Sequence, residues 1–162
     1  MVGLTAGVAV IAPADAVVRV VSSNATNYCQ AALPVFDTSI RKRPLSVQNE
    51  GSSTAFVTCS FHSEEAVSAA EIWLHAAAGQ TVTCTGVAGY NGASEAAVKS
   101  AVVGAGETQA WLSWNAADFP GGSMSSGLFS VSCGLQPGQG LDDTYLGYDD
   151  GTAAPASAGA VR

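Results

Sequence analysis

The chain has 162 residues, with 13 acidic against 6 basic residues and a formal net charge of −7. Its length suits one domain with a substantial core and leaves no room for two ordinary domains. The excess of acid argues against binding to nucleic acid or to anionic membranes. Only 12% of the residues are charged, about half the globular average, and Ala, Gly, Ser, Thr and Val fill the gap, which is typical of β-rich extracellular domains.

The first 16 residues resemble a signal peptide. Val2–Ala12 is an apolar run, and Ala14-Asp15-Ala16 fits a signal-peptidase site. The run is too short for a membrane-spanning helix, which takes about 20 residues. No Lys or Arg precedes it, so two readings stay open: a signal peptide that starts further upstream, or a buried first strand. We expect the signal peptide, and hence a secreted or periplasmic protein without a membrane span.

Four cysteines, at positions 29, 59, 84 and 133, predict two disulfides, because an even count in an exported chain indicates paired thiols. Of the three possible pairings we predict Cys29–Cys59 and Cys84–Cys133. The first would tie the N-terminal loop to the first strong strand. The second would join two strands with matching Val-x-Cys patterns, as a staple between two sheets. The spacing fits no zinc site.

The three clearest strands each carry an inward cysteine: Thr54–His62, Gln80–Val87 and Leu128–Leu135. Side chains alternate faces along a strand, and these segments alternate apolar with polar residues. Shorter strands are predicted at Leu45–Gln48, Glu71–His75, Thr108–Trp114 and Tyr145–Tyr148, with Val17–Val21 as a first strand or a leading arm. Ala96–Val103 fits a strand or a helix, and its valines favour the strand. Ser63–Ala70 is the best helix candidate, because a serine followed by two glutamates suits a helix start.

Eight or nine short strands separated by turns predict an all-β fold, an antiparallel β-sandwich that is Ig-like or jelly-roll-like, over residues 17–151. The Ala/Gly/Ser-rich residues 152–162 are expected to be disordered. The Gly/Ser-rich segment Asn115–Gly127 is expected to be a long mobile loop.

The signal-like start, the cysteine-bearing strands and the turn Leu135–Gly140 (Leu-Gln-Pro-Gly-Gln-Gly) occur together in this chain. In these features it resembles small secreted β-sandwich proteins of Gram-negative bacteria. The resemblance covers most of the chain and implies an exported bacterial β-sandwich. It brings no activity and no catalytic residues with it.

Five aromatic residues are candidate ligand contacts: Trp73, Tyr90, Trp111, Tyr145 and Tyr148. Sugar-binding sandwiches stack the apolar C–H face of a pyranose on exposed aromatic rings. Trp73 and Trp111 lie opposite the inward residues of their strands, so we expect them at the surface. The alternative is that both strands are buried on both sides, or that the tryptophans cover a loop.

Four carboxylates lie within nine residues, at Asp142, Asp143, Asp149 and Asp150. If this segment loops, they are a candidate calcium site, because Ca²⁺ takes six to eight oxygen ligands. If the segment between them is a strand, the two pairs lie about 20 Å apart and form an acidic edge. No other cofactor is indicated.

The histidines, His62 and His75, allow a hydrolase in which His62 works with a nearby acid such as Glu64 or Glu65. However, no Gly-x-Ser-x-Gly elbow is present. Nothing fixes the separation of these glutamates from Asp118, as a glycosidase pair requires.

The absence of a catalytic motif favours a secreted, non-catalytic binding or surface-interaction module, with carbohydrate as one candidate ligand and a surface protein as another. A secreted hydrolase and a structural subunit or inhibitor remain alternatives.

Overall fold

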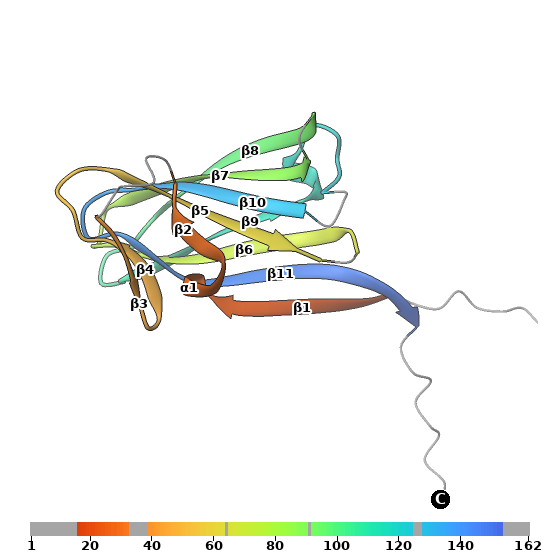
Figure 1. Cartoon of the computed structure of the whole chain (residues 1–162), viewed down its shortest axis with the longest axis horizontal. Helices are drawn as coiled ribbons and strands as arrows, with labels where there is room; N and C mark the ends of the chain where they lie inside the picture. Colours follow the sequence, from red (N-terminus) through yellow and green to blue (C-terminus); the bar gives the residue numbers. More distant parts are fainter. Residues whose placement is uncertain (1–15, 33–38, 64, 91, 125–127, 154–162) are drawn as a thin grey trace, which may run out of the picture.

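Two antiparallel sheets pack face to face in the computed structural model, which describes residues 16–32, 39–63, 65–90, 92–124 and 128–153 (Figure 1). The predicted antiparallel β-sandwich is therefore confirmed. The predicted signal peptide, except for Ala16, and most of the predicted tail lie outside the described residues.

The six-stranded sheet runs in the order β3-β4-β11-β6-β9, and β1 pairs with β11 on the same edge as β4. Its strands are β1 (Ala16–Asn24), β3 (Ile40–Arg43), β4 (Ser46–Asn49), β6 (Val67–His75), β9 (Gln109–Asn115) and β11 (Gly140–Ala153). The strand β11 is thus central and much longer than the short strand predicted at Tyr145–Tyr148.

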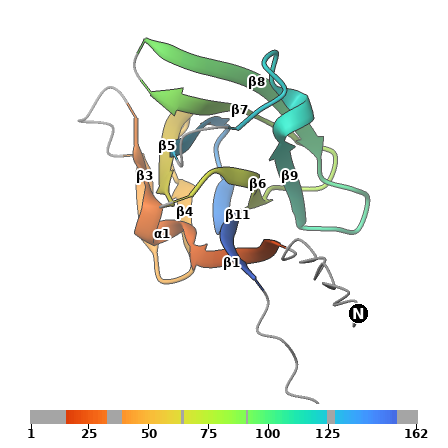
Figure 2. The ribbon, with the colours of Figure 1, turned by 90° about the vertical axis from the view of Figure 1, so that its right-hand side faces the viewer.

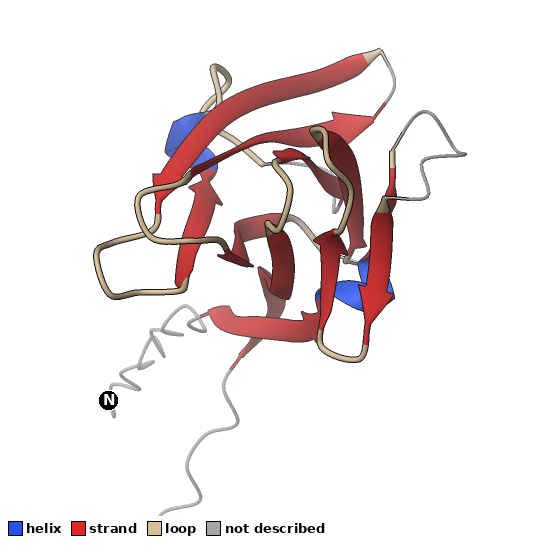
Figure 3. Ribbon diagram, turned by 90° about the vertical axis from the view of Figure 1, so that its left-hand side faces the viewer, coloured by secondary structure: helices blue, strands red, loops and turns tan. Residues whose placement is uncertain are grey.

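The five-stranded sheet runs in the order β2-β5-β10-β7-β8 and lies over the first sheet (Figure 2). Its strands are β2 (Cys29–Ala31), β5 (Ala55–His62), β7 (Thr81–Tyr90), β8 (Ala93–Val102) and β10 (Leu128–Leu135). Two helical turns, α1 (Ala25–Tyr28) and the 3₁₀ turn η1 (Ala116–Asp118), lie at the periphery of the two layers (Figure 3).

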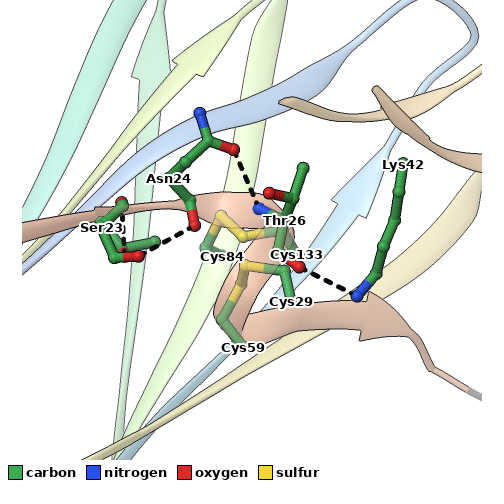
Figure 4. Close-up of a disulfide and its surroundings, with 9 residues drawn as sticks. Ser23, Asn24, Thr26, Cys29, Lys42, Cys59, Cys84 and Cys133 are labelled. Carbon is green, nitrogen blue, oxygen red and sulfur yellow. Dashed lines mark hydrogen bonds between the residues drawn. A yellow bond between two sulfur atoms is a disulfide. The ribbon is translucent and has the colours of Figure 1, made fainter. Parts of the chain in front are cut away.

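The turn α1 carries the chain from the six-stranded to the five-stranded sheet. Asn24 caps it by accepting the N–H of Thr26 at 3.1 Å, and the Lys42 Nζ donates to the Thr26 carbonyl at 3.0 Å (Figure 4). Ala25 is completely buried. The crossing between the layers is therefore held by a cap, by a side chain of β3 and by the core.

The core forms between the sheets because the inward positions of the strands are apolar. In β5 and β10 buried residues alternate strictly with exposed or partly exposed ones, as the period of a strand requires. Trp114 of β9 is fully buried and reaches across to the opposite sheet, where its Nε1–H donates to the Ala97 carbonyl of β8 at 3.0 Å. The same indole lies against Gly86 of β7, whose missing side chain leaves room for it. One tryptophan thus joins the two layers.

Both predicted disulfides are confirmed, and each joins directly opposed residues of neighbouring strands. Cys29 and Cys59 face each other in β2 and β5 with Cα atoms 4.0 Å apart, and Cys84 and Cys133 do so in β7 and β10 at 4.1 Å (Figure 4). The prediction that the second bond staples two sheets together is wrong. Both bonds lie within the five-stranded sheet, where they fasten β2 to β5 and β7 to β10.

The prediction of a helix at Ser63–Ala70 is wrong. Strand β6 already begins at Val67, and it pairs with β11 from there onwards. Val67 and Ala70 face the core, while Ser68 and Ala69 between them are exposed, because the ladder shifts register at this point. This bulge breaks the alternation by which a strand is recognised.

The segment predicted as a long mobile loop contains an anchored part. Phe119 and Met124 are buried, and Phe119 packs edge-on against Phe129 with ring centroids 6.3 Å apart. Residues 125–127 lie outside the described part of the chain.

In the described part of the chain, no helix has the length and apolar character needed to cross a bilayer.

Candidate functional site

Two tryptophans lie side by side on the outer face of the six-stranded sheet. Trp73 of β6 and Trp111 of β9 are cross-strand partners. Both side chains lie on the outer face, because their neighbours Ile72, Leu74 and Leu112 face the core. Their rings stack with centroids 5.6 Å apart and planes inclined by 26°. Trp111 is 58% exposed, and Trp73 is partly buried beside it. Trp111 therefore lies at the surface as expected, while Trp73 is only partly exposed, and we call the stacked pair the aromatic platform.

A polar row crosses the same face next to the platform, two residues further along β6 and β9. The His75 Nδ1 lies 2.6 Å from one Asp142 carboxylate oxygen, and the Gln109 Nε2 donates to the other at 3.0 Å. A carboxylate only accepts hydrogen bonds, so Nδ1 of His75 carries the hydrogen in this contact. When the ring is neutral, its Nε2 is left as an acceptor.

A bulge in β11 brings Asp142 to this row. Leu141 pairs with Leu74 and Thr144 with Ile72, so two residues of β11, Asp142 and Asp143, oppose the single residue between them on β6. Such a bulge bends a strand and redirects its side chains, and bulges are frequent beside functional sites. Leu141 and Thr144 are both buried, so the two aspartates between them both lie outside the core.

Close packing fixes the imidazole of this row. A Cβ atom on Gly140 would lie only 2.2 Å from the His75 Cε1, so the ring occupies the place of a side chain there. The His75 and Asp142 side chains are 24% and 15% exposed. Their inner parts are therefore held by the sheet while their polar atoms still reach the surface.

On the other side of the platform lies a second row with Glu71 and Tyr145, which are cross-strand partners in β6 and β11. The Trp73 indole N–H donates to the Glu71 carboxylate. Rows two residues apart on a strand are about 7 Å apart, so the three rows extend over about 13 Å. Within this distance the sheet offers carboxylates, an imidazole, an amide and aromatic rings.

Hollows adjoin both ends of this face. A cleft of about 520 Å³ continues from His75, Gln109 and Asp142 toward Asn24 and Gln48. At the other end, a smaller groove of about 280 Å³ runs beside Glu71 and Tyr145 and is walled by Val18, Val20, Ala69 and Gly147. The cleft is polar and the groove is apolar, so the face can accommodate a ligand longer than one ring.

The structure brings together three of the five predicted aromatic contacts and separates the others. Trp73 and Trp111 stack, and Tyr145 lies in the adjoining row. Tyr90 is 58% exposed but ends β7 in the other sheet, where it pairs with Ala93 of β8. Tyr148 lies beyond Tyr145 on β11, opposite Arg19 of β1. Tyr90 thus has no part in the platform.

The acidic residues predicted as a candidate calcium site lie along one extended strand. Asp142 and Asp143 occupy the bulge, and Asp149 follows further along β11, opposite Val18 of β1. The side chain of Asp150 is outside the described residues. Among the side chains that are described, no three His, Cys, Asp or Glu groups gather where they could hold a metal ion.

The acid–base candidates for hydrolysis lie apart. His62 is exposed at the end of β5, where it pairs with Leu128, and its imidazole has no hydrogen-bonding or ion-pairing partner within the described part of the chain. Asp118 lies in η1, 2.7 Å from the Lys99 ammonium, and hydrogen bonds from Lys99 and from the Asn115 N–H lower its pKa below the ordinary 3.8. A carboxyl group with a lowered pKa is a poor proton donor at neutral pH. Glu64 lies outside the description.

Sequence reasoning missed the pair of His75 and Asp142. The two residues are 67 positions apart, and no local pattern connects them. The only local signal was the pair of adjacent aspartates inside an otherwise alternating segment, which is where a bulge leaves an extra residue.

The comparisons with known proteins give structural neighbours only. No family model matches the chain, and no curated protein matches it. Over 78% of its length the chain is similar to the structure of TmCBM61 in complex with β-1,4-galactotriose, covering 86% of that chain at 15% identity with a TM-score of 0.44. Over 85% of its length it is similar to a Podospora anserina GH26-CBM35 β-(1,4)-mannanase, covering 29% of that chain at 12% identity with a TM-score of 0.39. At such identities and scores, the ligand of this chain has to be inferred from its own residues.

Proposed function

We propose that this protein is an exported, non-catalytic carbohydrate-binding module that takes a glycan along the outer face of its six-stranded sheet. The observation that carries the proposal is the stacked pair of Trp73 and Trp111 on that face, in which Trp111 is 58% exposed. Export is supported by the two disulfides, which form and persist in oxidising compartments.

The aromatic pair suits the apolar side of a sugar ring. Aromatic side chains present a flat apolar face with a polar edge, and the C–H face of a pyranose is complementary to it. Trp111 would make the contact, because its ring is the exposed one. Trp73 would act as a positioning residue, because it supports Trp111 from the side and is itself held by Glu71.

The polar row next to the platform suits the hydroxyl groups of the same ligand. Asp142 offers carboxylate oxygens as acceptors, Gln109 offers an amide, and Nε2 of neutral His75 is a further acceptor. Such groups give orientation to a ligand that is bound mainly through apolar contact. Because the row is about 7 Å from the platform, a ring stacked on Trp111 can extend toward the polar cleft.

Binding of a panel of polysaccharides tests the proposal, with affinity electrophoresis as a screen and calorimetry for any hit. The panel contains cellulose, chitin, xylan, mannan, galactan and starch. Trp111→Ala should weaken binding by roughly tenfold or more, as the loss of a tryptophan anchor does at other interfaces. Trp73→Ala should weaken it less, because the ring that it supports is still present.

Tyr90→Ala provides the matched control, since Tyr90 is an aromatic residue of equal exposure on the other sheet. It should bind as the wild type does. The proposal is wrong if no glycan binds, if Trp111→Ala binds like the wild type, or if Tyr90→Ala loses as much affinity. Release of reducing ends by the wild type would instead identify a hydrolase.

A further inference from the structure

The outer face of the five-stranded sheet lacks Asp, Glu, Lys and Arg altogether in the described part of the chain. Its outward positions on β2, β5, β10, β7 and β8 hold Ser, Thr, Val, Ala, Gly, Gln, Phe and Leu, with His62 at one end. The central row is Thr58, Ser132, Thr85 and Val98, which are successive cross-strand partners. We call this surface the uncharged face.

The uncharged face contrasts with the rest of the molecule. The chain carries a net charge of −7, and the outer face of the other sheet displays Glu71, Asp142 and Asp143. Even the charged residues of β8, Glu95 and Lys99, point away from the uncharged face, since Val98 and Ser100 take its outward positions. Acidic and basic residues are mostly exposed in folded proteins, yet among the described residues this whole sheet face displays none of them.

Apolar side chains lie on the same face among the hydroxyl groups. Phe56 is 53% exposed, Val98 67% and Val102 61%. Some of the hydroxyl groups form hydrogen bonds within the sheet, since the Thr83 Oγ1 and the Ser100 Oγ are 2.7 Å apart. Depletion of acidic residues and lysine and an exposed aromatic ring are two features of an interface core. β-Branched residues also suit the packing of one sheet on another.

The size of the face meets what a small dimer needs. Five strands about 4.8 Å apart span about 19 Å, and eight residues of a strand extend over about 26 Å, so the face measures about 500 Å². Two copies face to face would bury about 1,000 Å² in total, at the lower limit of specific interfaces. The ladders of β10 with β5 and β7 have no register shift, so the face is regular enough to meet its own copy.

We propose that the uncharged face binds a second copy of this chain, with the two five-stranded sheets packed about a two-fold axis. Charge decides in favour of this occupant. Two copies with a net charge of −7 each repel one another wherever acidic surfaces meet, and this face is the one sheet surface on which they can pack without opposing like charges. A closed pair also covers the exposed valines and Phe56 on both copies at once. This proposal is independent of the glycan site, which lies on the opposite side of the sandwich.

Sedimentation velocity and light scattering on the oxidised full chain test the proposal. Between about 10 μM and 1 mM, the wild type should shift from monomer to dimer, as expected for a small interface. Val98→Glu places a charge in the central row of the face, on its edge strand β8, and the symmetry places a second charge in the same interface. It should raise the dimer dissociation constant by at least tenfold. Val20→Glu is the matched control, because Val20 is a similarly exposed valine on the other sheet, and it should leave the dimer intact.

Salt dependence gives a second measure. Salt screens the repulsion between the two acidic copies, and the proposed interface contains no ion pair that salt could weaken. Raising the salt concentration should therefore strengthen association. Far-UV circular dichroism shows whether each variant is folded.

Three results would overturn the proposal: a wild type that stays monomeric at 1 mM, association that weakens with salt, or a folded Val98→Glu variant that dimerises like the wild type. If the wild type is monomeric and Val98→Glu loses adsorption to an insoluble polysaccharide, the face takes a solid ligand and not a second copy. The glycan platform is unaffected by any of these outcomes, because Trp111→Ala tests it separately.

Discussion

Replacing Gly86 with alanine should destabilise the protein through the one tryptophan that joins the two sheets. A Cβ atom at position 86 would lie 2.7 Å from the Trp114 Nε1 and 2.8 Å from its Cδ1. The indole cannot move away at low cost, because it is fully buried and its N–H donates to the Ala97 carbonyl. Alanine is otherwise acceptable in this strand, so the steric conflict dominates.

The size of the effect follows from two contributions. Overpacking of a core costs about 1 to 3 kcal/mol, and a displaced Trp114 leaves the buried partner of its hydrogen bond unsatisfied for about 1 to 3 kcal/mol more. The Gly86→Ala variant should therefore lose about 2 to 6 kcal/mol of the free energy of unfolding. This is a large share of the stability of an ordinary domain, which is about 5 to 15 kcal/mol.

Urea unfolding followed by far-UV circular dichroism measures this loss. Gly134→Ala on β10 is the matched control, because a Cβ there would meet the Phe56 ring at an ordinary contact distance of 3.4 Å. It should change the stability by less than about 0.5 kcal/mol. In a double-mutant cycle, Trp114→Leu should remove most of the cost of Gly86→Ala, because the clash disappears with the indole. A Gly86→Ala variant as stable as the wild type, or full additivity in the cycle, would refute the account of Trp114.

Two further predictions concern stability. Replacing Cys84 and Cys133 together with alanine should lower the free energy of unfolding by about 4 kcal/mol, because the bond closes a loop with a sequence separation of 49; unchanged urea midpoints would contradict this. Asp118→Asn should cost about 1 kcal/mol at neutral pH, because Asp118 pairs with Lys99 and accepts the Asn115 N–H. Since the folded state lowers the pKa of Asp118 below 3.8, this stabilisation is present above that pH and is lost as the pH falls through the lowered pKa. Thermal melts of both proteins from pH 7 to pH 2 should therefore converge in acid, and a difference that persists at low pH would count against the argument.

Strand alternation made most of the five-stranded sheet predictable. In β5, β7 and β10 a valine and a cysteine share the inward face, and their ladders are regular. The same matching patterns predicted the disulfide of Cys84 with Cys133. The position of that bond within one sheet was not predictable, because equal patterns do not say whether two strands are neighbours or face each other across the core.

The six-stranded sheet was harder to predict because its strands are irregular. The bulge near Ser68 places two exposed residues in succession, and the preceding Ser-Glu-Glu imitates a helix start. The adjacent aspartates of β11 have low strand propensity, so only Tyr145–Tyr148 was recognised as a strand. The stacking of Trp73 on Trp111 depends on the pairing of β6 with β9, two segments that are far apart in the sequence.

The two outer faces of the sandwich differ because the strands of one sheet are regular and a strand of the other sheet is bulged. In the five-stranded sheet the ladders of β5, β10, β7 and β8 have no register shift, so every second residue faces outward and the surface repeats Ser, Thr and Val. In the six-stranded sheet an extra residue in β11 breaks the repeat, and the Asp142 carboxylate of this bulge lies against His75, beside the tryptophan pair. A simple alternation of apolar and polar residues is enough to encode a regular strand, and regular strands produce a flat surface that suits another flat surface. An irregular strand departs from local preference, and such departures are expected where a protein binds something of defined shape. The position of the bulge next to the exposed Trp111 ring therefore supports the six-stranded sheet as the ligand-binding side of the molecule.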